Sequence, residues 1–212
     1  MSTSPSDIPT LFDLYSSGAI KEEGSGARYG VDEAIIKRVS IWRGDITKLE
    51  ADMIVNAANS SLLGGGGVDG AIHRAAGGEL LDECEGLGGA KTGETKITKG
   101  YKLPSKWVAH TVGPIYSSSR KEKCAEQLKS CYSTSLELCK SHGGGSIGFS
   151  SISTGVYGYP IKDATRIALD TTRRFLENDD TVTRVIYVVF SAKDEEVYKS
   201  LAPEYFPPSA GN

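Results

Sequence analysis

Short runs of β-branched and aromatic residues alternate with amphipathic stretches along most of the chain. Six runs have the length and composition of strands, and they cover residues 35–42, 53–55, 95–99, 107–112, 146–152 and 184–190. Five intervening segments carry apolar residues at steps of three or four and are predicted helices, at 69–76, 79–86, 121–142, 162–178 and 194–202. Alternation at this spacing predicts an α/β fold, a three-layer α/β/α sandwich around a sheet of about six strands.

The pattern divides the chain into one domain with an extension at each end. Residues 1–34 carry a short apolar patch and then the Gly/Ser/Glu-rich stretch 21–30, which predicts a docked helix followed by a flexible link. Residues 35–202 contain all the predicted strands and form the domain itself. Residues 203–212 contain three prolines and are predicted to be a frayed tail.

Charge and composition exclude several classes of partner. Among 212 residues, 24 Lys+Arg against 27 Asp+Glu give a net charge of −3, without the basic excess that binding to a nucleic-acid polymer needs. The longest aliphatic or aromatic run, 186–190, is far too short to cross a membrane, and the N-terminus lacks the pattern of a signal peptide. Four cysteines without C-x-x-C spacing fit a reducing setting, so we expect the protein in the cytoplasm, the nucleus or both.

The densest chemical signal is the segment 55–73, where a strand runs through two asparagines into four consecutive glycines and then a helix. Glycine loses the most backbone entropy on ordering, so an ordered run of four needs compensation. Backbone N–H groups without a neighbouring Cβ can approach an anion closely, and the start of the helix adds its positive dipole end. The pattern favours a phosphate ligand, although a flexible hinge would have the same composition.

A second glycine-containing turn, 151–161, also follows a strand and precedes a helix. Loops at the carboxyl ends of parallel strands meet in one crevice, so two such loops fit a diphosphate. Two standard nucleotide motifs fit poorly. The spacing Gly65-x-Gly67-x-x-Gly70 lies too far beyond its strand for a dinucleotide turn, and Glu94 stands where a P-loop needs lysine.

Five motifs in one order resemble the macrodomains, specifically the MacroD-type ADP-ribosyl hydrolases. They lie at 44–47, 55–59, 64–73, 110–114 and 151–160, and the similarity runs from about residue 35 to residue 201. The resemblance implies a mixed six-stranded sheet, binding of ADP-ribose, and hydrolysis without a metal or redox cofactor. Its expected reactions are removal of ADP-ribose from acidic side chains of proteins and deacetylation of O-acetyl-ADP-ribose.

The resemblance also assigns roles to single residues. The catalytic residues it implies are Asp69, with His73 as its helper, and Asn59. The ligand-binding residues are Asp45 and Ile46 with Phe190 for adenine, Asn56 and Asn59 for the distal ribose, Gly65, Gly66, Gly67, Val68, Ser153, Thr154, Gly155 and Val156 for the diphosphate, and Tyr157 as a cover over the ribose.

Each of these residue types has a structural alternative. Asp45 fits a turn cap, Asp69 fits a helix N-cap, and the two asparagines fit turn formers. Phe190 fits a core aromatic, and Tyr157 fits loop packing. His110 shares a strand face with Val108 and Val112, so we predict that it belongs to the core.

The preferred hypothesis is a monomeric hydrolase in which Asp69 aligns a water against an ester of the terminal ribose. The attacked atom, anomeric carbon or acyl carbonyl, stays open, as do the target proteins. The principal alternative is a non-catalytic reader of ADP-ribosylated proteins. A phosphatase acting on ADP-ribose 1″-phosphate is a weaker alternative, and an NAD-dependent dehydrogenase is the weakest.

Overall fold

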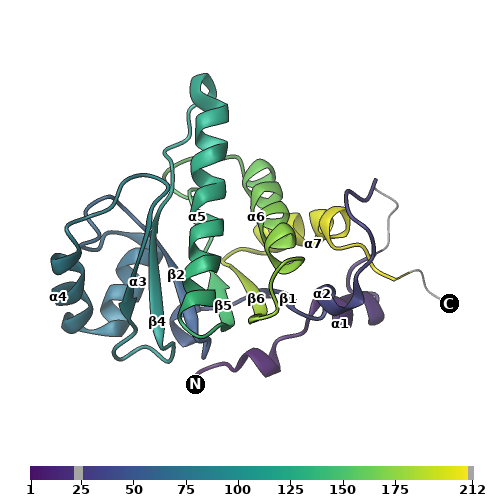
Figure 1. Cartoon of the computed structure of the whole chain (residues 1–212), viewed down its shortest axis with the longest axis horizontal. Helices are drawn as coiled ribbons and strands as arrows, with labels where there is room; N and C mark the ends of the chain where they lie inside the picture. The colour runs from purple at the N-terminus through teal and green to yellow at the C-terminus, as the bar shows by residue number, and fades with distance from the viewer. Residues whose placement is uncertain (22–25, 210–212) are drawn as a thin grey trace.

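The computed structural model describes residues 1–21 and 26–209, which build a mixed six-stranded sheet between two layers of helices (Figure 1). In spatial order the strands are β1 (Val39–Arg43), β6 (Val182–Val189), β5 (Gly145–Phe149), β2 (Met53–Ala58), β4 (Trp107–Val112) and β3 (Thr95–Lys99). All neighbours are parallel except β3 and β4, which are antiparallel. The predicted three-layer fold with a mixed sheet is confirmed.

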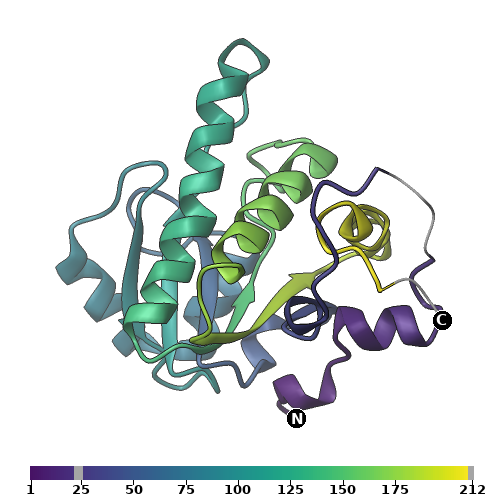
Figure 2. The ribbon, with the colours of Figure 1, turned by 45° about the vertical axis from the view of Figure 1, so that its right-hand side comes forward.

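Helices cover both faces of this sheet (Figure 2). The helices α3 (Gly67–Ala76) and α4 (Gly78–Leu87) pack on one face, together with the short η2 (Ile46–Lys48). The other face is covered by α5 (Lys121–Ser141), α6 (Ile161–Leu176) and α7 (Ala192–Tyr205), and the shorter α1 (Leu11–Ser16) and α2 (Glu33–Ile36) extend this layer. No helix in the described residues is long and apolar enough to cross a membrane.

Strand residues alternate between the two cores, as the period of two in a strand requires. In β2, Met53 and Val55 belong to the core under α5 and α6, whereas Ile54 belongs to the core under α3 and α4. The next residue on the α3 side is Asn56, and its register partner in β4 is His110. Asn56 and His110 therefore lie side by side in the otherwise apolar core between the sheet and α3 and α4.

The first predicted strand, 35–42, is wrong in its first half. Residues 33–36 form α2, because the Asp32 side chain accepts a hydrogen bond from the Ile35 amide at 3.1 Å and caps the helix. The β-branched pair at 35–36 still enters the core, but from a helix, and the strand starts only at Val39.

The N-terminal segment packs on the domain. Leu11 and Leu14 of α1 are buried in the larger core, and Thr10 and Asp13 form a reciprocal capping box at the start of that helix. The central part of the predicted flexible link, residues 22–25, lies outside the described residues.

The predicted frayed tail is wrong for residues 203–207. Helix α7 continues to Tyr205, and both Tyr205 and Phe206 are buried in the core. The buried Arg173 donates to the Tyr205 carbonyl at 3.1 Å, and Tyr15 donates its hydroxyl to the Phe206 carbonyl at 2.7 Å. Aromatic burial therefore outweighs the proline content here, and residues 210–212 lie outside the described part.

Candidate functional site

Four parallel strands end at the same edge of the sheet, and the sequence-predicted site residues follow those ends. The segment 44–48 follows β1, the loop 59–66 follows β2, the loop 150–160 follows β5, and Phe190 follows β6. Ligands of open α/β sheets bind outside the carboxyl ends of the strands. The topology thus brings segments from distant parts of the chain to one edge.

Asp69 lies in the first turn of α3 and is 5% exposed. Its Oδ1 accepts a hydrogen bond from Asn56 Nδ2 at 2.8 Å, and His73 Nε2 lies 3.5 Å from the same oxygen. The alternative that Asp69 caps the helix is wrong, because α3 begins at Gly67 and its N-cap, Gly66, makes no side-chain cap. The carboxylate is directed to Asn56 and His73 instead, near the positive end of the helix dipole.

The glycine loop is shaped by close contacts that only glycine permits. A Cβ on Gly70 would lie 2.4 Å from the Gly65 carbonyl oxygen, so the loop lies directly on the first turn of α3. A Cβ on Gly65 would lie 3.1 Å from Asp69 Oδ2 and 3.3 Å from Asn59 Nδ2. Asn59 also holds the loop, since its Nδ2 donates to the Gly64 carbonyl at 2.9 Å. Asn59 and Asp69 therefore flank Gly65, while Gly66 and Gly67 are exposed.

The second loop is held against the segment that follows β4. A Cβ on Gly113 would lie 2.2 Å from Ser153 Oγ, and the Tyr116 amide donates to the Tyr157 carbonyl at 2.9 Å. Ser153 adopts the left-handed region with φ 64, and its buried Oγ has no hydrogen-bond partner. Val156 at the tip is fully exposed. A strained, tethered backbone with an exposed tip is typical of a binding loop.

The residues predicted to bind adenine differ in their surroundings: Asp45 and Ile46 lie in a hydrogen-bonded turn, whereas Phe190 is exposed. Asp45 Oδ1 accepts hydrogen bonds from the Thr47 amide at 2.9 Å and from the Thr47 hydroxyl at 2.7 Å. The turn cap predicted as an alternative role for Asp45 is therefore present. Ile46 is buried beneath that turn. Phe190 is 94% exposed, so the alternative of a core aromatic is wrong. An aromatic ring left in water at the end of a central strand is free to stack on a flat ligand.

His110 has more contacts than its predicted core role suggests. It is fully buried, and its ring lies 3.1 Å from Asn56 Nδ2 through Nδ1 and 2.8 Å from Thr98 Oγ1 through Nε2. Burial lowers its pKa from 6.5 to about 3, with a smaller effect from His73. Sequence reasoning missed this contact with the site. No sequence signal could have found it, because the contact depends on the pairing of β2 with β4, which places His110 beside Asn56.

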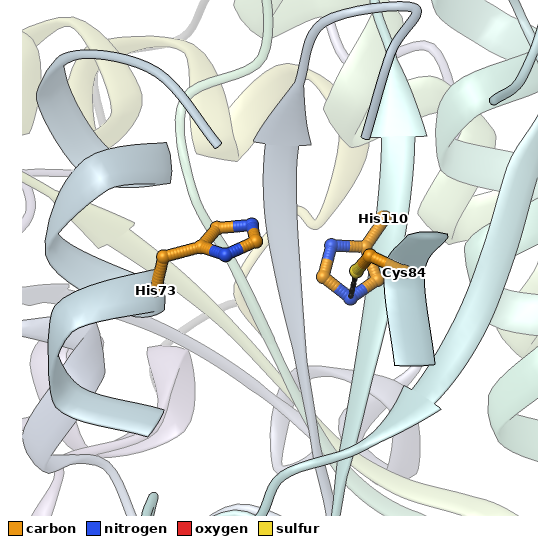
Figure 3. Close-up of side chains that lie close together, drawn as sticks. All are labelled: His73, Cys84 and His110. Atoms are coloured by element: carbon orange, nitrogen blue, oxygen red, sulfur yellow. Dashed lines mark hydrogen bonds between the residues drawn. The ribbon is translucent and has the colours of Figure 1, made fainter. Parts of the chain in front are cut away.

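His73, Cys84 and His110 offer atoms that could ligate a metal, and these atoms lie within 4.8 Å of one another (Figure 3). Cys84 Sγ lies 3.8 Å from His110 Nε2, and burial raises the pKa of the Cys84 thiol to about 11. A metal here would have to displace the Thr98 hydroxyl from His110 Nε2. The cluster therefore fits a hydrogen-bonded core better than a metal centre.

Comparison with known proteins gives a consistent result. The family model described as Macro domain matches residues 55–168. The chain is 50% identical to ADP-ribose glycohydrolase MACROD1 of Mus musculus over 94% of its own length and 62% of the relative. It is 48% identical to ADP-ribose glycohydrolase MACROD2 of Xenopus laevis, of which it spans 49%. A macro domain-containing protein of Chlorobaculum tepidum is 55% identical over 76% of this chain and 93% of that protein.

Solved structures agree with the sequence relatives. The macro domain of ganglioside induced differentiation associated protein 2 superposes with a TM-score of 0.90 at 35% identity, covering 99% of this chain and 98% of that one. The Trypanosoma brucei macrodomain in complex with ADP-ribose gives a TM-score of 0.80 at 40% identity, and the match covers 93% of this chain and 75% of that one.

Proposed function

The chain belongs to the Macro domain family, and from that membership we propose that it is a mono-ADP-ribosyl hydrolase. Its substrates would be ADP-ribose esters on acidic side chains of proteins, and O-acetyl-ADP-ribose. Two relatives named ADP-ribose glycohydrolases and a related macrodomain crystallised with ADP-ribose support this proposal. The chain spans about half to two thirds of those named relatives, so the proposal concerns this domain.

One observation carries the catalytic part of the proposal: the Asp69 carboxylate is held by Asn56 and approached by His73 beside an exposed glycine loop. A carboxylate fixed in this way can accept a hydrogen bond from a water and orient it. Amides of the glycine loop and of the first turn of α3 would stabilise negative charge on the diphosphate. Reader modules need the binding loops but have no use for a positioned carboxylate.

The remaining subsites follow from the position of these residues at or after the strand ends. We propose that Phe190 stacks on adenine, with Asp45 and the Ile46 amide at its edge. Asn56 and Asn59 would contact the distal ribose, and Tyr157 would cover it. Gly65, Gly66, Gly67 and Val68 on one side and Ser153, Thr154, Gly155 and Val156 on the other would hold the diphosphate. These residues lie in loops at one edge of a single sheet, and we propose that the protein acts as a monomer.

The test compares three proteins on a peptide carrying ADP-ribose on a glutamate. Wild type should release ADP-ribose, Asp69→Ala should be slower by at least about 100-fold, and Asp82→Ala, which changes an exposed carboxylate on the neighbouring helix, should match wild type. ADP-ribose binding by calorimetry should survive in all three. Binding without release by wild type would refute the hydrolase and favour a reader.

Two additional measurements sharpen the result. In H₂¹⁸O, label in the freed carboxyl group means that water attacked the acyl carbonyl, and an unlabelled carboxyl group means that it attacked the anomeric carbon. The carboxyl group decides, because the anomeric hydroxyl of free ADP-ribose exchanges with solvent. Release of inorganic phosphate from ADP-ribose 1″-phosphate would favour the phosphatase alternative.

The proposal places the protein in the cytosol or nucleus. All four cysteines are free and buried, which fits a reducing compartment. Microscopy of a tagged full-length protein tests the location.

A further inference from the structure

A line of buried polar side chains runs beneath the candidate catalytic residue. Thr98 of β3 contacts His110 of β4, His110 contacts Asn56 of β2, and Asn56 contacts Asp69 of α3, at 2.8, 3.1 and 2.8 Å. The first three side chains are 0% exposed, and Asp69 is 5% exposed. Four separate elements thus contribute one residue each to a continuous hydrogen-bonded chain.

The chemistry of the groups fixes the direction of every bond in this line. An ionised Asp69 only accepts, so the Asn56 group that faces it must be the Nδ2 amide, which carries two hydrogens. The second hydrogen points to His110 Nδ1, which must therefore hold a lone pair. The ring proton then lies on Nε2 and is donated to Thr98 Oγ1. Turning the Asn56 amide over would place its oxygen against the Asp69 carboxylate.

This arrangement requires a neutral ring, and the surroundings provide one. Burial holds the pKa of His110 near 3, so the ring carries no charge at neutral pH. The arrangement also leaves Asn56 Oδ1 buried without a hydrogen-bond partner among the described residues. An acceptor in this state, next to Asp69, is ready for a hydroxyl group of a ligand.

We infer that His110 and Thr98 are positioning residues for the reaction. The Thr98 hydroxyl gives the His110 Nε2–H an acceptor and so holds the ring in place, with the Nδ1 lone pair facing the Asn56 carboxamide. Asn56 then fixes Asp69 through Nδ2 and presents Oδ1 to the substrate. The inference rests on the proposed hydrolase activity, and it assigns a role to two residues that touch neither substrate nor water.

The same cluster offers a matched control. Cys84 lies 3.8 Å from His110 Nε2 and is equally buried, but it stands outside the line of hydrogen bonds to Asn56. If His73, Cys84 and His110 held a metal ion instead, loss of Cys84 would be as damaging as loss of the Thr98 hydroxyl. The two explanations therefore predict opposite results for one variant.

The kinetic experiment uses Thr98→Val, which keeps the shape and removes the hydroxyl, and Thr98→Ser, which keeps the hydroxyl. Thr98→Val should lower kcat by about tenfold or more, the effect of losing one buried hydrogen bond, while Thr98→Ser restores it to within about threefold of wild type. Cys84→Ala should stay near wild type. Equal rates for Thr98→Val and Thr98→Ser, or a loss in Cys84→Ala as large as in Thr98→Val, would overturn the inference.

The spectroscopic experiment reads the tautomer directly, which a general loss of packing would not change. In protein labelled with ¹⁵N-histidine, His110 should show a neutral ring with its proton on Nε2 at pH 7, and in Thr98→Val the resonance of that proton should move upfield because the proton has lost its acceptor. A wild-type ring protonated on Nδ1 would refute the assignment.

The two proposals can also fail separately. Wild type that binds ADP-ribose without turnover would refute the hydrolase. The positioning role would then still be tested by the tautomer of His110 and by ADP-ribose affinity. We expect Thr98→Val to lose affinity and Cys84→Ala to keep it.

Discussion

The buried imidazole of His110 should make the fold sensitive to acid. Its pKa is lowered from 6.5 to about 3, first by burial and second by His73. Between these two values the unfolded chain binds a proton at this residue and the folded chain does not. The unfolded state is therefore favoured as pH falls through this window. The stabilising effect is complete above pH 6.5 and is lost progressively from pH 6.5 down to about pH 3.

The size of the effect follows from the two pKa values. At pH 4.5 the unfolded imidazole is almost fully protonated and the folded one almost fully neutral, so the free energy of unfolding should be about 2.5 kcal/mol lower than at pH 7 through this residue alone. Urea unfolding followed by tryptophan fluorescence, at pH 7 and 4.5, measures the change. The His110→Asn variant keeps an acceptor for Asn56 and removes the titrating ring.

The variant isolates the contribution of His110 from that of its neighbours. The titratable groups near it are His73 from α3 and Cys84 from α4, with Asp69 beside His73, and all three remain in the variant. His110→Asn should start less stable at pH 7 but lose about 2.5 kcal/mol less than wild type on acidification. An equal loss in both proteins would show that the folded state accepts the proton on His110, and the reasoning would be refuted.

Three further predictions concern single side chains. Gly66→Ala should leave urea unfolding unchanged, because the added Cβ meets nothing within 4 Å and the φ of −91 suits alanine. If the loop lies against the diphosphate, the same variant should bind ADP-ribose about tenfold or more weakly in calorimetry. Phe190→Ala should likewise keep the stability of the fold, since the ring is 94% exposed, and lower ADP-ribose affinity by about fivefold or more; an unchanged affinity would remove it from the adenine site. Gly86→Ala, in α4 with open space around it, should raise the free energy of unfolding by about 0.5–1 kcal/mol; a lower value would mean that the added methyl group is not accommodated.

The sequence predicted the strands well because β-branched and aromatic residues concentrate in them. Thr95–Lys99 and Trp107–Val112 occur as strands with the predicted bounds. The errors fall where a local interaction decides against the apolar pattern. At 33–36 the Asp32 cap produces a helix, and at 203–207 aromatic side chains pack a segment that proline content marks as a tail.

The candidate site was predictable at the level of loops but not of contacts. Consecutive glycines and the paired asparagines mark the loop after β2, because such residues are unfavourable within regular structure. The bond from Asn56 to Asp69 depends on how α3 packs on β2, and the contacts of His110 with Asn56 and Thr98 depend on the pairing of β2 and β3 with β4. Periodicity specifies neither. The helix start was also misplaced at residue 69, so a helix cap was an alternative role for Asp69. The structure has Gly66 at the N-cap position, without a side-chain hydrogen bond.

The distribution of unpaired polar atoms connects the fold to the site. Five buried side-chain atoms of the described residues have no hydrogen-bond partner, and three of them, Asn56 Oδ1, His73 Nε2 and Ser153 Oγ, belong to the candidate site. Each such atom costs about 1–3 kcal/mol in a folded protein. Among the described residues outside the site, only Ser105 Oγ and Trp107 Nε1 are also buried without a partner, whereas both nitrogens of the His110 ring have one. Most of the unmet hydrogen-bonding capacity of the described residues therefore lies in the candidate site, where the hydroxyl groups of a bound sugar diphosphate would supply the partners.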